Sequence, residues 1–418
     1  MKPPTLKNDC FAMPAGVDWT PVDQALDLLR ARLHPVVACE RAEVAASLGR
    51  ILAADIRALR ANPPVANSAV DGFGFASDGL GKGVQILPLV AGRSAAGARF
   101  MGVVPNGYAV RILTGAAVPN GVDTVVMNED TTFERDRIAF HNELKKGANT
   151  RKAGEDFNAG QTLFRAGHRI SAADIAVITA SGIAEIEVFA RLKVGVLSTG
   201  DEICDAGTET DSDRIFDANR PMLLAILTRW GFEAVDLGHV GDDRAAVRAR
   251  LDQAAETVDA MLTSGGASAG EEDHLSAIFK AEGQISSWRI ALKPGRPLAL
   301  GMWRETPVFG LPGNPVAAFV CTLIFARPAL GLLAGAGWET PQGFDVKAEF
   351  AKDKKPGRRE YLRARMNDQG RAEVYPSEGS GRISSLSWAD GLVELADEAA
   401  QIQSGSLVKY YPFGSFGL

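Results

Sequence analysis

Four glycine-bearing segments directly follow apolar runs. They are STGDE (198–202), GDD (241–243), SGGASAGEED (264–273) and LPGNP (311–315). Glycines at a strand-to-helix junction expose backbone N–H groups to an anion, and a helix N-terminus attracts negative charge. These loops are therefore predicted to hold a phosphorylated ligand through Ser198, Thr199, Gly200, Gly265, Gly266, Ser268 and Gly270.

Three of these loops also carry carboxylates, of which Glu202, Asp242 and Asp273 stand out. Clustered carboxylates would repel an anion unless a cation lay between them, so they predict a hard metal such as Mg²⁺, or another divalent cation. The alternative is that each Asp caps a helix. Because four such loops follow the strands of one predicted sheet, a ligand-binding site is favoured over helix capping.

One segment imitates a hydrolase motif. Residues 266–270 match G-x-S-x-G, the nucleophile elbow around a serine, here Ser268. The only later histidine is His274, six positions on, which is too close to serve as the base, so a serine hydrolase is rejected. The chain has no Walker A motif, no G-x-G-x-x-G after a strand and no zinc-binding spacing of histidines.

A basic set lies in a later segment and comprises Arg289, Lys293 and Arg296, around a turn at Pro294 and Gly295. Arginine and lysine together suit phosphate or another oxyanion. A solvated surface loop is the alternative. In the first half of the chain, Asp71 and Thr114 lie in glycine-containing turns. These turns could contribute to a site, and a purely structural role explains them equally well.

The elements that would position these loops alternate between strand and helix from 191 to 335. Apolar strands are expected at 194–198, 232–240, 258–264 and 307–311, and helices at 220–230, from 242 or 243, and after Asn314 and Pro315 as N-cap and first-turn residues. This order predicts an open, mainly parallel sheet with helices on both faces and ligands beyond the carboxyl ends of its strands.

The regions on either side of this α/β domain are predicted to be rich in β-strands. The predicted fold is multidomain, with an irregular β-rich region 1–190, the α/β domain 191–335 and a small C-terminal β-barrel or sandwich at 336–418. The first region is expected to divide into about 18–61 with 145–190, and 62–144. It should begin with an amphipathic helix, residues 20–33, capped by Thr20, and a second helical stretch from Ala42 to Leu48.

Composition restricts the class of protein. The chain has 418 residues, 46% of them hydrophobic, and a net charge of −6, which argues against nucleic-acid binding through bulk charge. Its longest apolar run is too short to span a bilayer, and its N-terminus lacks a secretory h-region. Four scattered cysteines fit a reducing compartment. We therefore expect a cytoplasmic protein with no membrane or nucleic-acid partner.

The ordered segments resemble molybdopterin molybdenumtransferases, the family that includes bacterial MoeA and the gephyrin E-domain. The resemblance extends from about 18 to 413, over NSAVDGFGF, RILTGAAVPNGVDTVVMNED, NTRKAGEDFNAG, VGVLSTGDEI, RIFDANRPML, TSGGASAGEEDH, ALKPGRP, VFGLPGNP, GRREYLRAR and SEGSGRISSLSWADGL. It implies that molybdate is inserted into adenylated molybdopterin, with release of AMP and with a divalent cation. It also implies an elongated homodimer whose subunits share the active site.

The resemblance also implies roles for particular residues. Asp71, Thr114 and Asp156 look like first-half site residues, and Glu202, Asp242 and Asp273 like the metal-linked set. Arg289 and Lys293, with Arg296 alongside, look like the basic set around phosphate or molybdate. Pro312, Gly313 and Pro315 resemble a loop lining the pocket, and Arg358 and Ser380 look like oxyanion and pterin contacts.

Three positions depart from the family pattern. Phe73 follows Asp71-Gly72 where the family usually has tyrosine, Arg296 replaces lysine, and Glu378 replaces glutamine. Two other functions are weighed. The preceding adenylyl-transfer step uses much shorter enzymes, and an interaction scaffold would not need the acidic positions. For an enzyme that inserts molybdate, pterin-adenylating enzymes and recipient molybdoenzymes are the expected partners.

Overall fold

The computed structural model describes residues 19–418 except 210–212, 266–273, 283, 288–289 and 296–298. The chain forms two compact units. The first contains the residues up to Glu40, Gly49–Ala53 and Val188–Leu418, and the second contains Arg41–Leu48 and Ala54–Glu187.

The centre of the first unit is a six-stranded sheet in the order β16-β13-β17-β21-β20-β18. Its first four strands are parallel, β20 runs antiparallel to β21, and β18 runs antiparallel to β20. The parallel strands therefore all end at one edge, as the sequence predicts for a ligand site. The bounds are β13 Lys193–Thr199, β16 Glu233–Val240, β17 Ala260–Ser264, β18 Gln284–Ser287, β20 Ala299–Trp303 and β21 Thr306–Leu311.

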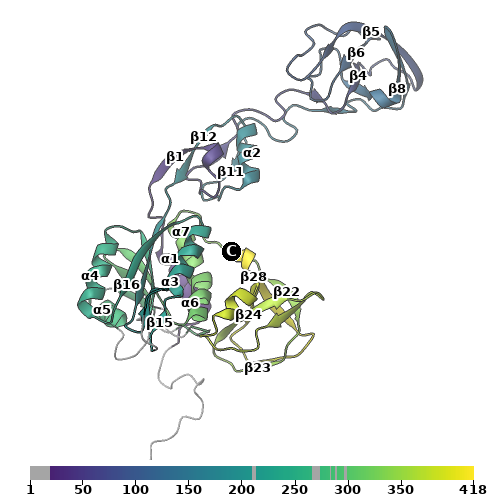
Figure 1. Cartoon of the computed structure of the whole chain (residues 1–418). Coiled ribbons are helices and arrows are strands. Elements are labelled where there is room, and N and C mark those ends of the chain that lie inside the picture. Colours follow the sequence, from purple (N-terminus) through teal and green to yellow (C-terminus); the bar gives the residue numbers. More distant parts are fainter. Residues whose placement is uncertain (1–18, 210–212, 266–273, 283, 288–289, 296–298) are drawn as a thin grey trace, which may run out of the picture. The chain divides into compact units, whose positions relative to one another are not determined.

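Helices cover both faces of this sheet, which confirms the predicted α/β architecture. Successive residues of a strand point to opposite faces, and two separate apolar clusters follow this alternation: Val196 belongs to one and Leu197 to the other. Figure 1 shows α4 and α5 on one side of the sheet and α3 and α6 on the other. The helices are α3 Asn219–Arg229, α4 Arg244–Ala255, α5 His274–Glu282, α6 Pro315–Cys321 and α7 Arg327–Leu333.

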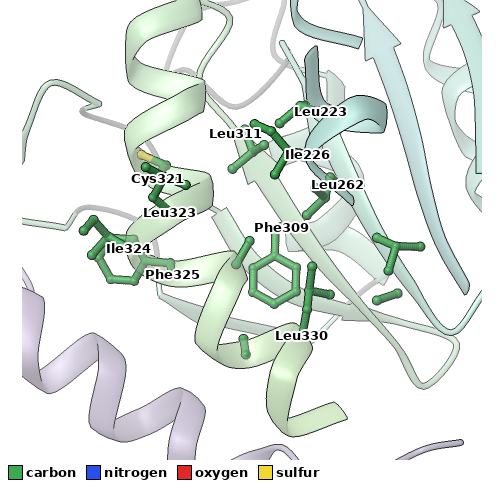
Figure 2. Packing of buried hydrophobic residues seen from close by; sticks show 14 of the residues in the cluster. Leu223, Ile226, Leu262, Phe309, Leu311, Cys321, Leu323, Ile324, Phe325 and Leu330 are labelled. Atoms are coloured by element: carbon green, nitrogen blue, oxygen red, sulfur yellow. The ribbon is translucent and has the colours of Figure 1, made fainter. Parts of the chain in front are cut away.

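Helices α6 and α7 are joined by a π-helical stretch, Thr322–Ala326, into one apolar segment. By length and composition Pro315–Leu333 could cross a membrane, but 89% of its apolar window is buried inside the protein. Figure 2 shows Leu323, Phe325 and Leu330 of this segment in the cluster that contains Phe309 of β21. An all-round apolar surface is what a core helix requires.

The C-terminal part of the first unit is a closed barrel. Its strands pair in the order β24-β25-β22-β28-β26, and β26 pairs back to β24, so the barrel alternative is confirmed over the sandwich. The bounds are β22 Phe344–Ala348, β24 Arg359–Met366, β25 Arg371–Val374, β26 Gly391–Leu395 and β28 Leu407–Pro412. The short strand β19, Leu292–Lys293, pairs with β24 and brings Lys293 opposite Glu360.

The second unit is rich in short strands. Its largest sheet has the order β7-β4-β6-β5-β9-β8, with bounds β4 Gly72–Phe75, β5 Gly83–Ser94, β6 Ala109–Ile112, β7 Thr124–Met127, β8 Thr131–Glu134 and β9 Arg137–Asn142. A smaller part contains helix α2, Ala172–Ala180, and the pair β2 Ile56–Arg57 with β11 Thr162–Phe164.

Two predictions near the N-terminus are wrong in detail. Helix α1, Val22–Arg32, buries Val22, Ala25 and Leu29 as predicted, but its N-cap is Pro21. Thr20 instead forms a β-bridge with Ile290. The expected helix at Ala42–Leu48 is a strand end and a 3-10 turn. A segment this short cannot sustain a helix by itself, and the Ser47 hydroxyl closes the turn on the Val44 carbonyl.

Candidate functional site

The carboxyl edge of the α/β sheet carries buried hydroxyls. Ser198 and Thr199 end β13, with exposed fractions of 0% and 4%, and Ser198 lies opposite Ser264 at the end of β17. Among the described residues, neither the Ser198 nor the Thr199 hydroxyl has a hydrogen-bond partner. Because an unpaired buried hydroxyl costs about 1–3 kcal/mol, such groups point to a functional surface.

Asn219, the first residue of α3, joins two of the loops at this edge. Its side-chain amide donates to the Ser264 hydroxyl at 2.8 Å and to the Gly313 carbonyl at 2.7 Å. The loops after β17 and β21 are therefore held to each other through one buried side chain. Its Oδ1 has no hydrogen-bond partner within the described part of the chain.

The position of Asn219 is fixed by its neighbours in the sequence. The Asp217 carboxylate accepts from the N–H groups of Asn219 and Arg220, both at 3.1 Å, at the start of α3. The Arg220 guanidinium also donates to both oxygens of Asp236, at 2.8 and 2.9 Å. Burial alone would lower the Arg220 pKa, but the hydrogen bonds to Asp236 and Asp217 raise it. The guanidinium therefore stays positively charged.

The loops after β13 and β16 are joined by a reciprocal pair. The Asp201 N–H donates to the Asp242 carboxylate at 3.1 Å, and the Asp242 N–H donates to that of Asp201 at 3.0 Å. Helix α4 is capped by Asp243, which accepts from the Ala246 N–H at 2.7 Å. The capping role therefore falls to Asp243, and Asp242 remains in the site loop.

Glycine is required at two points of this edge. Gly200 has φ +131°, and a Cβ there would lie 2.2 Å from a carboxylate oxygen of Glu202. Gly265 has φ +91°, and a Cβ would lie 2.4 Å from the Thr199 carbonyl oxygen. In both cases a side chain would strain the backbone, and at Gly265 it would also collide with the backbone at the end of β13.

The predicted metal set is only partly described. Glu202 and Asp242 follow adjacent strands and offer the oxygen donors that Mg²⁺ prefers. Within the described residues, no group of three His, Cys, Asp or Glu side chains could hold a metal ion. The third predicted ligand, Asp273, lies outside them. The donor chemistry fits Mg²⁺, and the described donors alone do not complete its site.

A cavity of about 290 Å³ lies where β19 meets the barrel. It is lined by Lys293, Pro294, Phe350, Ala351, Lys352, Tyr361, Leu362, Arg363, Val374, Tyr375, Pro376, Ser377 and Glu378. Lys293 Nζ lies 2.5 Å from Glu378 and 3.5 Å from Glu360, and Lys352 Nζ lies 3.1 Å from Glu360. We call these five residues, Lys293, Lys352, Glu360, Arg363 and Glu378, the charged cluster.

The loop that contains Ser380 lies against the start of α6. The Ser380 carbonyl accepts from the Val316 N–H at 3.1 Å, next to Pro315 and after the buried Pro312. The structure thus brings Ser380 to the loop of Pro312, Gly313 and Pro315. Arg358 is partly buried and precedes Arg359, which forms a bidentate pair with Asp23.

Three predicted residues belong to the second unit. The Asp71 carboxylate accepts from both the Thr114 hydroxyl and the Thr114 N–H at 2.6 Å, and the hydroxyl hydrogen bond is the main cause that lowers the Asp71 pKa. Asp156 instead accepts from the Asn62 amide at 2.9 Å. The structure brings Asp71 and Thr114 together, and it gives Asp156 a different partner.

Six predicted residues lie outside the described residues: Gly266, Ser268, Gly270, Asp273, Arg289 and Arg296. The reasoning from sequence also missed residues. Asn219, Lys352 and Arg363 were not singled out, although Asn219 lies in RIFDANRPML, two positions after an aspartate with capping potential. No spacing rule indicates Lys352 and Arg363, because the pairing of β19 with β24 and the ion pairs of Lys352 bring together residues from distant parts of the chain.

Three family models match this chain consecutively. "MoeA N-terminal region (domain I and II)" matches residues 20–182, "Probable molybdopterin binding domain" matches 195–331, and "MoeA C-terminal region (domain IV)" matches 345–413. The chain is 34% identical over 398 residues to molybdopterin molybdenumtransferase of Haemophilus influenzae, covering 94% of this chain and 98% of that protein. It is 31% identical to molybdopterin molybdenumtransferase 2 of Mycobacterium tuberculosis, covering 87% of this chain and 92% of that protein.

Solved structures show the same fold. A crystal structure of the molybdopterin biosynthesis MoeA protein from Pyrococcus horikosii superposes with a TM-score of 0.77 and 27% identity, covering 95% of this chain and 99% of that chain. The chain is similar to these proteins over almost its whole length, and its motifs follow the order of the family. The chain belongs to the molybdopterin molybdenumtransferase family.

Proposed function

We propose that this protein inserts molybdate into adenylated molybdopterin and releases AMP, a step of molybdenum cofactor biosynthesis. The observation that carries the proposal is the similarity to a molybdopterin molybdenumtransferase over 98% of that protein's length. The geometry supports it with buried hydroxyls at the carboxyl edge of a parallel sheet and with a cavity, lined by lysine and arginine, where β19 meets the barrel.

The chemistry needs binding and charge stabilisation rather than a nucleophilic side chain. One water hydrolyses the phosphoanhydride, and two molybdate oxygens leave as water. The protons come from the two thiols and from the hydrolysis, so the net products are AMP, the metal-containing cofactor and one water. Hydroxyl, N–H and amide groups around Ser198, Ser264 and Asn219 suit the pterin or its phosphates, and lysine and arginine suit the molybdate dianion.

Mg²⁺ is proposed as the divalent cation, held by Glu202, Asp242 and Asp273. When bound, it would offset the negative charge that develops on the leaving phosphate. The carboxylates of Glu202 and Asp242 would supply two of its oxygen ligands. Asp71 and Thr114, which already form a compact polar pair, are proposed as first-half contacts to the substrate.

We also propose a cytoplasmic homodimer whose active site combines residues of both subunits. The family assignment and the resemblance of the first-half motifs support this arrangement. Arg358 and Ser380 are proposed as oxyanion and pterin contacts. Enzymes that adenylate the pterin would supply the substrate, and molybdoenzymes would receive the product.

The test is AMP release by the purified full-length protein. Adenylated molybdopterin and Mg²⁺ are supplied with or without molybdate, and AMP is quantified by chromatography. Release that depends on molybdate, and that falls at least about tenfold when Mg²⁺ is chelated, supports the proposal. AMP release that is equal with and without molybdate contradicts metal insertion.

A further inference from the structure

We propose that Glu378 is an internal anion that occupies the cationic cavity and competes there with a tetrahedral dianion, thereby setting the cavity's affinity for its anion. The inference rests on the proposed function only for naming that dianion as molybdate. It depends on the charged cluster, all of whose members lie in the first compact unit.

Three cations are within interaction distance of one carboxylate. Glu378 lies 2.5 Å from Lys293 Nζ and also pairs with Lys352. Its negative charge acts on Arg363 as well: burial lowers the Arg363 pKa, and Glu378 partly offsets that effect. Burial would raise the Glu378 pKa, but the hydrogen bonds from Lys293 and Lys352 lower it, so this carboxylate is charged at neutral pH.

The two carboxylates of the cluster differ in burial. The Glu360 side chain is 9% exposed and lies on β24, opposite Lys293 of β19. The Glu378 side chain is 47% exposed and lies in the irregular segment between β25 and helix α8, Ser384–Trp388. Glu360 is therefore a fixed member of the cluster. Glu378 can turn into solvent at little cost, because almost half of its side chain is already hydrated.

The charges then favour a dianion. Within the charged cluster, three cations face two carboxylates when Glu378 is in place, and these five residues together carry one positive charge. When the Glu378 carboxylate withdraws, two positive charges remain, which match a dianion such as molybdate. The cavity has a volume of about 290 Å³, and a water molecule occupies about 30 Å³ in the liquid, so a small oxyanion with some hydration fits.

Arg363 is the third cation of this cavity. Arg363 is 4% exposed and lines the cavity, and its Nε has no hydrogen-bond partner among the described residues. Its Nη2 is held by the Ser377 carbonyl, and its guanidinium lies 5.7 Å from the Tyr375 ring centre. The guanidinium is thus fixed in orientation, and its positive charge adds to the attraction of the cavity for an oxyanion.

The test measures molybdate binding to the full-length protein and to Glu378→Gln at low ionic strength, by equilibrium dialysis with metal analysis. The variant should bind molybdate about fivefold to tenfold more tightly, because it keeps the shape of the side chain and removes the competing charge. The affinity of Glu378→Gln for formate, a monoanion, should increase less than its affinity for molybdate. Glu373→Gln is the matched control, since Glu373 lies on the same barrel, pairs with Arg365 and does not line the cavity. It should bind molybdate as the unaltered protein does.

Lys352→Gln is the second variant, and thermal melting verifies the fold of each protein. Lys352→Gln should weaken molybdate binding at least about fivefold. In the double variant with Glu378→Gln it should cancel the gain in molybdate affinity. Equal affinity of Glu378→Gln and the unaltered protein would mean that Glu378 only fastens its loop, and would overturn the inference. Absence of molybdate binding in both would also overturn it. The AMP assay judges the proposed function separately from either result.

Discussion

Asn219 is the residue through which two active-site loops are fixed to each other. The residue is 6% exposed, and its side-chain amide donates to Ser264 at the end of β17 and to Gly313 in the loop after β21. Removing both hydrogen bonds leaves the buried Ser264 hydroxyl without that donor, which costs about 1–3 kcal/mol. Because both loops belong to the proposed substrate surface, their displacement should also slow the reaction.

We therefore expect Asn219→Ala to lower the free energy of unfolding by about 1–3 kcal/mol and to reduce kcat for molybdate-dependent AMP release at least about tenfold. Urea unfolding and the AMP assay measure the two effects. The control is Thr228→Ala on the same helix, since Thr228 is exposed and its hydroxyl donates to the Leu224 carbonyl of its own helix. A variant with normal kcat, even if less stable, would show that Asn219 is purely structural.

At the same scale, the sequence predicted which residue types reach the sheet edge, but not which of them contact one another. Asp242 was recognised as either a cap or a site residue, and only its partner Asp201 and the cap Asp243 separate the two. Of the charged cluster, the sequence singled out Lys293 as a basic residue and Glu378 as a departure from the family pattern, but not their contact. Strand β24, which carries Glu360 and Arg363, pairs with β19 across more than sixty positions, and no local pattern encodes this pairing.

At the level of elements, helix α1 is attached to the barrel through charge. Arg359 on β24 donates to both oxygens of Asp23 in the first turn of α1, at 2.7 and 2.8 Å. This hydrogen bond is the main cause that lowers the Asp23 pKa. The pair is bidentate, which places it at the upper end of the small contributions expected of surface ion pairs.

The stabilisation by the Asp23–Arg359 ion pair depends on pH. Because the folded-state pKa of Asp23 lies below the unfolded value of about 3.9, the contribution is complete above that value and is lost as the pH falls through the folded pKa. Asp23→Asn should therefore lower the free energy of unfolding by about 0.5–1 kcal/mol at pH 7 and by less below pH 4. Asp27→Asn, an exposed position of the same helix, should show no such difference. An equal loss at both pH values would exclude the ion pair as its cause.

Most elements of the α/β domain were predictable because strand and helix signals agree there with the burial that the fold requires. The Val22, Ala25 and Leu29 stripe and the apolar runs at β13, β17 and β21 are each buried as predicted. The errors are the helix expected at Ala42–Leu48 and the cap of helix α1. Thr20 has the right chemistry for an N-cap, but a tertiary contact with Ile290 directs its backbone into a bridge instead. Local propensity cannot anticipate such a competition.

For the whole molecule, the boundaries of the predicted domains stay a prediction, and so does the shared active site. The structure places Asp71 and Thr114 in one compact unit and Asp242 in the other. If the active site combines residues of two subunits, an inactive Asp71 variant and an inactive Asp242 variant should complement each other. Within one subunit, two such defects would affect the same site and could not.

Complementation tests this directly. Asp71→Asn and Asp242→Asn are each expected to reduce AMP release at least about tenfold, and both should sediment at about twice the 44.3 kDa subunit mass. After subunit exchange in an equal mixture, half of the dimers are mixed, and one of their two sites is intact, so about a quarter of the normal activity should return. The control is a mixture of Asp71→Asn with Thr114→Val, which affect the same side of the site and should not recover. Sedimentation as a monomer at micromolar concentration, or a mixture no more active than its components, would contradict the shared-site dimer.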